Sequence, residues 1–371
     1  MKKNLIIFGT RPEAIKMAPL VNKFLLDSRF QTKVCVTGQH REMLDQVLDF
    51  FNIVPDYDLN LMKPNQNLYN LTGEVITGLK PILESYQPDF VYVHGDTTTT
   101  MAASIASFYF GAKVCHIEAG LRTNNKLSPF PEEVNRQIAG RVATYHFAPT
   151  QKSKENLTKE NISEESILIT GNTVIDALLD SISRVKNINN SEVKEIKSNV
   201  NLENRIILVT GHRRENHGQG FVSICEALKE IAINNPKIEI VYPVHFNPNV
   251  LEPVNKLLRG VKNIHLLKPL SYPTFVWLMS QSYLIITDSG GIQEEAPSLG
   301  KPVLVMRNTT ERPEALVAGT VILVGTDKDE IVNETQNLLN NSEKYTAMST
   351  LYNPYGDGKA CEKIIKFVAN L

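Results

Sequence analysis

The sequence is short of the features that mark several large classes of protein. Its 371 residues include only four cysteines, which lie far apart and form no CxxC pair: Cys35, Cys115, Cys225 and Cys361. We therefore expect reduced structural thiols in a cytoplasmic protein, with neither a disulfide framework nor a metal site. The longest apolar runs have the length of a strand, so no segment is expected to span a membrane. The run after Met1-Lys2-Lys3 is also too short for a signal peptide.

Charge of one sign is not in excess either. The 39 Lys and Arg residues balance 40 Asp and Glu residues, which leaves a formal net charge of −1. Since proteins that bind nucleic acid or anionic membranes carry a basic face, neither partner is expected. The sequence also has no GxGxxG fingerprint after a strand, so a dinucleotide cofactor has little support and we expect no cofactor.

What the chain does contain is a regular alternation of short apolar runs and longer helical patterns. In the first half, the expected strands are Leu5–Phe8, Lys33–Thr37, Phe90–His94, Val114–Ile117, Tyr145–Ala148 and Ile167–Thr170. In the second half, they are Ile206–Thr210, Ile238–Val244, Ile264–Leu267, Leu284–Thr287, Val303–Met306 and Val321–Val324. Continuous apolar strands separated by helices predict parallel sheets that are covered on both faces.

A polar stretch rich in Asn, Ser, Lys and Glu interrupts this alternation and suggests two domains. We expect an α/β protein with two doubly wound, Rossmann-like domains facing a central cleft. The expected bounds are 1–170 for the first domain, 171–204 for a crossover and 205–355 for the second domain. A C-terminal helix within 356–371 is expected to pack back on the first domain. Ligands of open α/β sheets bind beyond the carboxyl ends of the strands, so functional residues are sought there.

The first strand ends in Gly9-Thr10-Arg11-Pro12-Glu13, which opens a helix. Glycine allows a tight turn, and proline suits the first turn of a helix. The helix N-terminus, Arg11 and Lys16 together form a candidate phosphate site. The alternative is a capped helix with a surface arginine.

The second half repeats this pattern at Asp288-Ser289-Gly290-Gly291. Ser289, Gly290 and Gly291 would present backbone N–H groups and a hydroxyl to a diphosphate. Glu295 could accept hydrogen bonds from ribose hydroxyls, or it could be a solvated carboxylate on a helix.

Acidic residues follow two neighbouring strands of the first half. Asp96 and Glu118 come directly after strands, and Glu132 lies in a loop that enters a helix carrying Arg136, a candidate substrate contact. Carboxylates that lie close together in a partly dry site acquire separated pKa values and can divide acid and base roles. The alternative for Asp96 is a helix cap, since Thr97 and further threonines follow it.

Cations follow two strands of the second half. His212 is positioned to meet a phosphate or to protonate a leaving group, and Arg213 adds positive potential. His245 ends another strand and has a weaker case. Arg312 could neutralise a phosphate or pair with Glu314.

Taken together, these motifs resemble the non-hydrolysing UDP-N-acetylglucosamine 2-epimerases of bacteria over nearly the whole chain. The matching segments are Phe8–Lys16, His94–Thr98, Glu118–Arg122, Gly171–Thr173, Gly211–Glu215, Asp288–Glu295 and Asn353–Gly358.

The resemblance implies a GT-B type fold and the interconversion of UDP-N-acetylglucosamine and UDP-N-acetylmannosamine for surface-polysaccharide synthesis. It also implies a homodimer without nicotinamide or metal. The implied catalytic residues are Asp96, Glu118, Glu132 and His212. The implied nucleotide-sugar contacts are Arg11, Lys16, Phe275, Ser289, Gly290, Gly291, Glu295 and Arg312. A regulatory substrate site, known in several relatives, would use Gln39, Glu42, Arg213 and His245, with Glu42 in place of the glutamine of some relatives.

The C2 hydrogen of such a sugar is not acidic, so direct removal without a redox step would be slow. We expect loss of UDP from C1 to make the C2 proton removable and to leave a glycal, after which UDP adds back with a proton on the other face of C2. The alternatives are a hydrolysing epimerase, a glycosyltransferase of the same fold and a non-catalytic nucleotide-sugar sensor.

Overall fold

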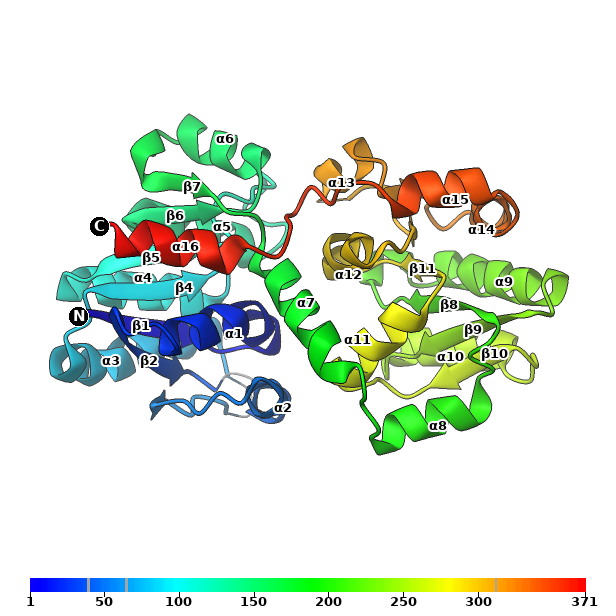
Figure 1. The fold of residues 1–371 in the computed structure, drawn as a ribbon, viewed down its shortest axis with the longest axis horizontal. Coiled ribbons are helices and arrows are strands. Elements are labelled where there is room, and N and C mark those ends of the chain that lie inside the picture. Colours follow the sequence, from blue (N-terminus) through cyan, green and yellow to red (C-terminus); the bar gives the residue numbers. More distant parts are fainter. Residues whose placement is uncertain (39–40, 64–65, 311) are drawn as a thin grey trace. The chain divides into compact units, whose positions relative to one another are not determined.

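The chain folds into two compact units that are each built around a parallel sheet (Figure 1). The structure, a computed structural model, describes residues 1–38, 41–63, 66–310 and 312–371, with the backbone alone for Arg41 and Glu42. Unit 1 comprises Met1–Leu179 and Tyr355–Leu371, and unit 2 comprises Asp180–Pro354.

Unit 1 contains a seven-stranded sheet in the order β3-β2-β1-β4-β5-β6-β7, with every neighbouring pair parallel. Its strands are β1 (Lys2–Phe8), β2 (Phe30–Val36), β3 (Tyr57–Asp58), β4 (Phe90–His94), β5 (Lys113–Ile117), β6 (Tyr145–Ala148) and β7 (Ile167–Ile169). Its helices are α1 (Arg11–Leu25), α2 (Arg41–Phe51), α3 (Leu68–Tyr86), α4 (Thr98–Phe110), α5 (Glu132–Val142), α6 (Gln151–Lys159), the 3-10 turn η1 (Glu164–Ser166) and α16 (Ala360–Ala369).

Unit 2 contains a six-stranded parallel sheet in the order β10-β9-β8-β11-β12-β13. Its strands are β8 (Arg205–Thr210), β9 (Ile238–Pro243), β10 (Ile264–Leu267), β11 (Leu284–Thr287), β12 (Val303–Val305) and β13 (Val321–Leu323). Its helices are α8 (Ser191–Asn199), η2 (Arg214–Asn216), α9 (Gln219–Asn234), α10 (Pro248–Leu258), α11 (Tyr272–Gln281), α12 (Gly290–Glu295), η3 (Ala296–Leu299), α13 (Pro313–Val317), α14 (Lys328–Asn340) and α15 (Ser342–Ser349).

The strands expected from the sequence are all present, and β3 is an additional strand of two residues. The segment expected to be a crossover is divided differently. Helix α7 (Thr173–Val185) begins in unit 1 and ends in unit 2. Helix α8 belongs to unit 2, where Glu192 accepts a hydrogen bond from the Ser271 amide at 3.1 Å. Among the described residues, none of the helices combines the length and the apolar character needed to cross a bilayer.

Both sheets reverse their strand order at one place. In unit 1, β1 pairs with both β2 and β4, and in unit 2, β8 pairs with both β9 and β11. The loops that leave such a pair of strands diverge toward opposite faces of the sheet. This divergence makes room for a ligand beyond the carboxyl ends of the strands.

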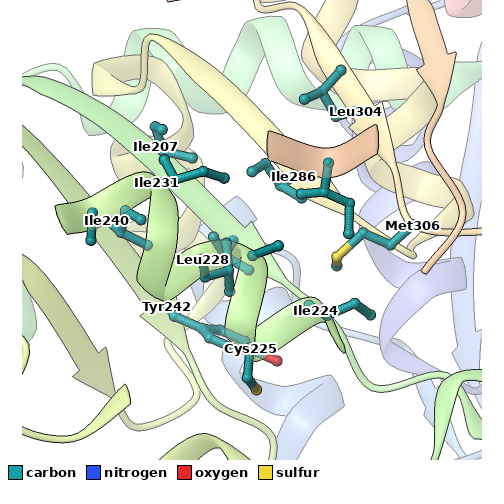
Figure 2. Packing of buried hydrophobic residues seen from close by; sticks show 14 of the residues in the cluster. Ile207, Ile224, Cys225, Leu228, Ile231, Ile240, Tyr242, Ile286, Leu304 and Met306 are labelled. Atoms are coloured by element: carbon teal, nitrogen blue, oxygen red, sulfur yellow. The ribbon is translucent and has the colours of Figure 1, made fainter. Parts of the chain in front are cut away.

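The core of unit 2 lies between α9 and the sheet. Figure 2 shows this layer, to which α9 contributes Ile224, Leu228 and Ile231 and the strands contribute Ile207, Ile240 and Ile286. Tyr242 is fully buried in the same cluster, and its hydroxyl donates to the carbonyl of Gly211 at 3.0 Å. This hydrogen bond satisfies the only polar atom of the side chain and fixes the first residue of the turn after β8.

The C-terminal helix α16 is attached to unit 1 at both ends. Asp176 of α7 is buried and accepts hydrogen bonds from the first two amides of α16, Ala360 at 3.1 Å and Cys361 at 3.0 Å. At the other end, Lys2 donates to the carbonyl of Val368 at 2.9 Å. A carboxylate at the N-terminus of a helix and a cation at its C-terminus both complement the helix dipole.

We expect Asp176→Ala to destabilise unit 1. The substitution leaves two buried amides without an acceptor, and each such group costs about 1–3 kcal/mol. Chemical denaturation should show a lower free energy of unfolding. Asp180→Ala is the matched control on the same helix, since the Asp180 side chain pairs with Arg184 in a partly exposed i,i+4 contact that contributes about 0.5 kcal/mol. Equal losses in the two variants would contradict a capping role for Asp176.

Candidate functional site

The turn after β1 is organised by the buried carboxylate of Glu13. Thr10 caps α1, and Glu13 Oε2 accepts hydrogen bonds from the amides of Gly9 at 3.0 Å and Thr10 at 2.8 Å. This is a capping box, in which residues of the first turn satisfy the free amides of the helix end. Arg11 is therefore the first residue of α1 and half-buried, at the helix N-terminus expected from the sequence.

The other oxygen of Glu13 reaches the turn after β4. Glu13 Oε1 accepts hydrogen bonds from the hydroxyls of Thr97 at 2.7 Å and Thr100 at 3.3 Å. Because Glu13 is only 2% exposed, this single side chain ties the two loops at the strand reversal together. Glu13 lies within the first motif, but no role for it is expected from the sequence.

Thr97, and not Asp96, caps helix α4. The Thr97 hydroxyl accepts from the amide of Thr100 at 3.0 Å, so the interpretation of Asp96 as the helix cap is wrong. The Asp96 carboxylate instead forms an ion pair with Nη2 of Arg136. Arg136 is 5% exposed, and its Nη1 donates to Glu133 at 3.1 Å. Glu133 therefore orients the guanidinium, which in turn orients Asp96.

Glu118 follows β5 and has a left-handed backbone, with φ of +60°. This conformation is uncommon outside glycine, and non-glycine residues in it concentrate at functional sites. A Cβ atom at Gly95 would lie 3.9 Å from Glu118 Oε1, so the carboxylate lies against the turn that carries Asp96. The structure thus brings the turns of these two predicted carboxylates together.

Three polar side chains surround Glu118 Oε2. Lys16 forms an ion pair with it, Asn172 donates to it at 2.8 Å, and His94 Nε2 lies 3.6 Å away. Burial by itself would raise the pKa of Glu118, but the charges of Lys16 and His94 outweigh burial and hold this pKa well below the ordinary value. Glu118 is consequently a carboxylate that stays ionised.

Glu132 has a different environment. It is the first residue of α5, and its Oε2 is buried without a hydrogen-bond partner among the residues that the structure describes. The neighbouring Glu133 is fully buried and accepts from the amides of Thr123 and Asn124, both at 3.0 Å. The two adjacent glutamates therefore differ in function. Glu133 holds the loop before α5, whereas one oxygen of Glu132 is not committed to the fold.

A buried histidine supports the same region. His116 of β5 is fully buried, and burial lowers its pKa to about 3. Its Nε2 lies 2.7 Å from the carbonyl oxygen of Gly95. A neutral imidazole that donates to this carbonyl fixes the turn after β4, so His116 serves the fold and not proton transfer.

In unit 2, the turn after β8 is organised by Asp288. Its Oδ2 accepts hydrogen bonds from the amides of His212 and Arg213, both at 2.8 Å. Asp288 is fully buried at the end of β11, so it joins the two loops at the strand reversal of unit 2. The motif that contains Asp288 was selected from the sequence, but this role was not.

His212 lies between an acid and a second histidine. Its Nδ1 is 3.7 Å from Asp288 Oδ1, and its ring stacks on that of His245 with centroids 5.4 Å apart. Burial, His245 and Arg213 lower the pKa of His212, whereas Asp288 raises it, and the balance lies below the ordinary value. The neutral imidazole is therefore the dominant form near neutral pH.

The first turn of α12 carries cations beside its glycines. A Cβ atom at Gly290 would lie 3.9 Å from Arg312 Nη2 and 4.0 Å from Arg213 Nη2. At Gly291, a Cβ atom would lie 3.8 Å from Glu295 Oε2 and 3.9 Å from the hydroxyl of Ser289. Guanidinium groups beside backbone amides suit a diphosphate, and a carboxylate next to them suits ribose hydroxyls.

Arg312 pairs with Glu294, with its Nε donating to Glu294 Oε1. The sequence had suggested that Arg312 either neutralises a phosphate or pairs with Glu314. Glu294 is 2% exposed, so it holds the guanidinium at a fixed place beside α12. Phe275 is half-buried on α11, while Trp277 of the same helix is buried and lies 5.7 Å below the Lys197 ammonium.

The structure describes only some of the residues expected to form a regulatory site. Gln39 lies outside the described residues, and the side chain of Glu42 does too. Arg213 and His245 both lie beside His212 in unit 2.

Two Rossmann-like units with parallel sheets define an α/β protein of the GT-B-like class, and solved structures of similar fold confirm this expected fold class. The family model described as UDP-N-acetylglucosamine 2-epimerase matches residues 23–369. The chain belongs to this family.

Individual relatives agree with this assignment. The chain is 58% identical to the UDP-N-acetylglucosamine 2-epimerase of Campylobacter jejuni, covering 99% of this chain and 97% of that protein. It is also 58% identical to the enzyme of the same name from Escherichia coli strain K12, covering 99% and 98%. The crystal structure of UDP-GlcNAc 2-epimerase from Neisseria meningitidis, bound to UDP-GlcNAc, matches with a TM-score of 0.89 at 50% identity and covers 100% of both chains.

The ion pair between Lys16 and Glu118 yields a pH-dependent prediction. In Lys16→Met, the pKa of Glu118 should rise, because burial is then opposed by fewer charges. The variant should lose about 1–3 kcal/mol of stability near neutral pH. A depressed folded-state pKa stabilises the protein above the ordinary glutamate value of 4.5, and this stabilisation is lost as the pH falls through the folded-state pKa.

The stability difference between the wild type and Lys16→Met should therefore shrink in acid, which denaturant titrations at several pH values measure. Lys16→Arg retains the charge and is the control, for which the pH dependence of stability should stay close to that of the wild type. A stability difference that does not change with pH would refute the coupling.

Proposed function

We propose that the chain interconverts UDP-N-acetylglucosamine and UDP-N-acetylmannosamine by losing and regaining UDP at C1. The observation that carries this proposal is that unit 1 contains carboxylates of different character after its strands, while unit 2 contains guanidinium groups beside a glycine turn. Family membership supports the choice of sugar nucleotide, since the Neisseria meningitidis enzyme was solved with UDP-GlcNAc bound.

In the proposed reaction, unit 2 holds the leaving diphosphate. The amides of Ser289, Gly290 and Gly291 and the guanidiniums of Arg213 and Arg312 would stabilise the charge that develops as the bond from C1 to the phosphate oxygen breaks. Glu295 would accept hydrogen bonds from the ribose, and Phe275 would contact the uracil.

His212 would assist at the same oxygen. A neutral imidazole binds a phosphate oxygen through an N–H group, and a protonated one can transfer its proton to the leaving group. The lowered pKa of His212, which burial causes, leaves the ring neutral near neutral pH in the free protein, and the charge of a bound diphosphate would raise this pKa and favour the second role. Arg11 would add a further cation at the N-terminus of α1.

The carboxylates of unit 1 would act on the sugar. Glu118 stays ionised because of Lys16 and His94, so it is a weak base and is better suited to stabilising positive charge at C1. Glu132 has a buried oxygen that no described group engages, and proton transfer at C2 requires such an oxygen. Asp96, oriented by Arg136, is the second candidate for moving a proton.

Solvent isotope exchange tests the elimination route. In D2O, UDP-sugar recovered at equilibrium should carry deuterium at C2, because the proton removed on one face is replaced from a group that exchanges with solvent. Proton NMR of the recovered nucleotide sugars measures this directly. Retention of protium at C2 in the epimerised product would exclude the route. Free N-acetylmannosamine in the same spectra would instead indicate a hydrolysing enzyme.

The variant Asp96→Asn tests the carboxylates. Since acid–base groups contribute about 100- to 10,000-fold to a rate, kcat should fall by at least about a hundredfold, while UDP binding, which the proposal assigns to unit 2, persists. Isothermal titration with UDP and an NMR time course with UDP-N-acetylglucosamine separate the two effects. A near-normal rate would return Asp96 to a purely structural role.

We also propose a homodimer. Support comes from the face formed by α3 and α4, where Phe108 is 60% exposed and Tyr109 is 76% exposed. A groove of about 430 Å³ runs beside them, lined by Ile76, Leu83, Ala106 and Phe110 among others. Exposed aromatic residues beside an apolar groove are typical of a surface that another chain covers. Activation by substrate at a regulatory site stays a prediction, and so does the supply of a surface polysaccharide.

A cytoplasmic location is likewise a proposal. Its support is that Cys35, Cys115, Cys225 and Cys361 are all buried and unbridged. Structural thiols of this kind are typical of a reducing compartment.

A further inference from the structure

The carboxylate of Asp288 has one oxygen that the fold uses and one that it does not. Oδ2 accepts the amides of His212 and Arg213 and lies 3.4 Å from Asn216 Nδ2. Oδ1 is buried and accepts no hydrogen bond from the residues that the structure describes. A buried carboxylate oxygen without a donor is costly, so its presence needs an explanation.

An ionisable group close to this oxygen is His212. Its Nδ1 lies 3.7 Å from Asp288 Oδ1, which is slightly beyond hydrogen-bond range. A small rotation of the imidazole would close this gap, and hydrogen bonds of catalytic groups often shorten when substrate binds. The backbone of His212 cannot drift, because the same carboxylate holds its amide at 2.8 Å.

The remaining neighbours of the ring do not compete for its Nδ1 proton. His245, from the loop after β9, stacks on the His212 ring with an angle of 17° between planes, and Arg213 is a cation that offers no acceptor. Asp288 is therefore an anionic group that faces the imidazole within unit 2.

We propose that Asp288 is a positioning residue for His212: it holds the imidazole with a proton on Nδ1, so that Nε2 is the nitrogen that takes up the second proton and donates it to the diphosphate of the substrate. One side chain thus sets both the backbone and the tautomer of the histidine. The ring nitrogen that carries the proton is decided by the hydrogen bond that the other nitrogen makes. The consequence for catalysis rests on the proposed function, whereas the effect of Asp288 on the histidine does not.

Asp288→Asn is the discriminating change, because an asparagine can still accept the two backbone amides with its single oxygen. Its NH2 group would then face His212 Nδ1 and favour the wrong tautomer. Nitrogen-15 NMR of histidine should show neutral His212 protonated on Nδ1 in the wild type and on Nε2 in the variant. The pKa of His212 should fall in the variant, since the negative charge that raises it is gone.

Asn216→Ala is the matched control. It removes a neutral donor from the same carboxylate oxygen and a hydrogen bond to the carbonyl of Met306 at 3.0 Å, but it retains the charge that faces His212. This variant should lose stability while its His212 tautomer and titration stay as in the wild type. The same change of tautomer in both variants would overturn the proposal, and so would an Nε2-protonated His212 in the wild type. The wild-type measurement decides even where Asp288→Asn does not fold.

A double-mutant cycle tests the catalytic consequence. Asp288→Asn should lower kcat about a hundredfold or more with little change in KM, and it should add less than about threefold in a His212→Ala background. Equal effects in both backgrounds would show a merely structural role and overturn the proposal. A His212→Ala enzyme of normal activity would instead refute the proposed function of His212, and the NMR result would still decide the positioning role.

Discussion

A buried carboxylate at the strand reversal of each sheet is the constraint on which both halves of the candidate site depend. Parallel sheets of this kind direct the loops of the two central strands to opposite faces, so these loops would separate without a tie. In unit 1, Glu13 joins the turn after β1 to the turn after β4. In unit 2, Asp288 joins the turn after β8 to the end of β11. Each carboxylate accepts hydrogen bonds from amides that the start of a helix or turn leaves free. These hydrogen bonds fix the conformation of the loop.

The residues that would contact substrate lie next to the turns that Glu13 and Asp288 hold. Arg11 and Lys16 follow Glu13's turn, and Asp96 precedes the threonines that Glu13 accepts from. A second set of acids then orients individual cations: Glu133 holds Arg136. Glu294 does the same for Arg312 in unit 2. All four of these acidic residues are buried, so they shape loops or orient cations and leave the chemistry to other side chains.

Local patterns in the sequence predicted much of this, and the missing parts share one physical cause. Apolar runs such as Leu5–Phe8 and glycine-containing turns depend on residues that are adjacent in the sequence. Strands, helix starts and candidate ligand-binding residues could therefore be predicted. The hydrogen bonds of Glu13 and Asp288 could not be predicted in this way, because their partners are distant in the sequence. Glu13 accepts a hydrogen bond from a hydroxyl 84 residues away, and Asp288 accepts one from an amide 75 residues away. Spacing equally favoured Asp96 as a helix cap, and only the geometry of the Thr97 hydroxyl decided against it.

The cations paired with the carboxylates of unit 1 indicate which carboxylate suits proton transfer and which suits charge stabilisation. Lys16 neutralises Glu118, and Arg136 is shared by Asp96 and Glu133. In a site from which water is partly excluded, the carboxylate of Glu118, whose pKa is held well below the ordinary value, resists protonation and is a poor proton carrier, but it opposes a developing cation at little cost of reorganisation. The oxygen of Glu132 has neither a cation nor an amide to hold it among the described residues. In the proposed reaction, proton movement at C2 and charge stabilisation at C1 would therefore fall on different residues, because the fold neutralises Glu118 and leaves one oxygen of Glu132 uncommitted among the described residues.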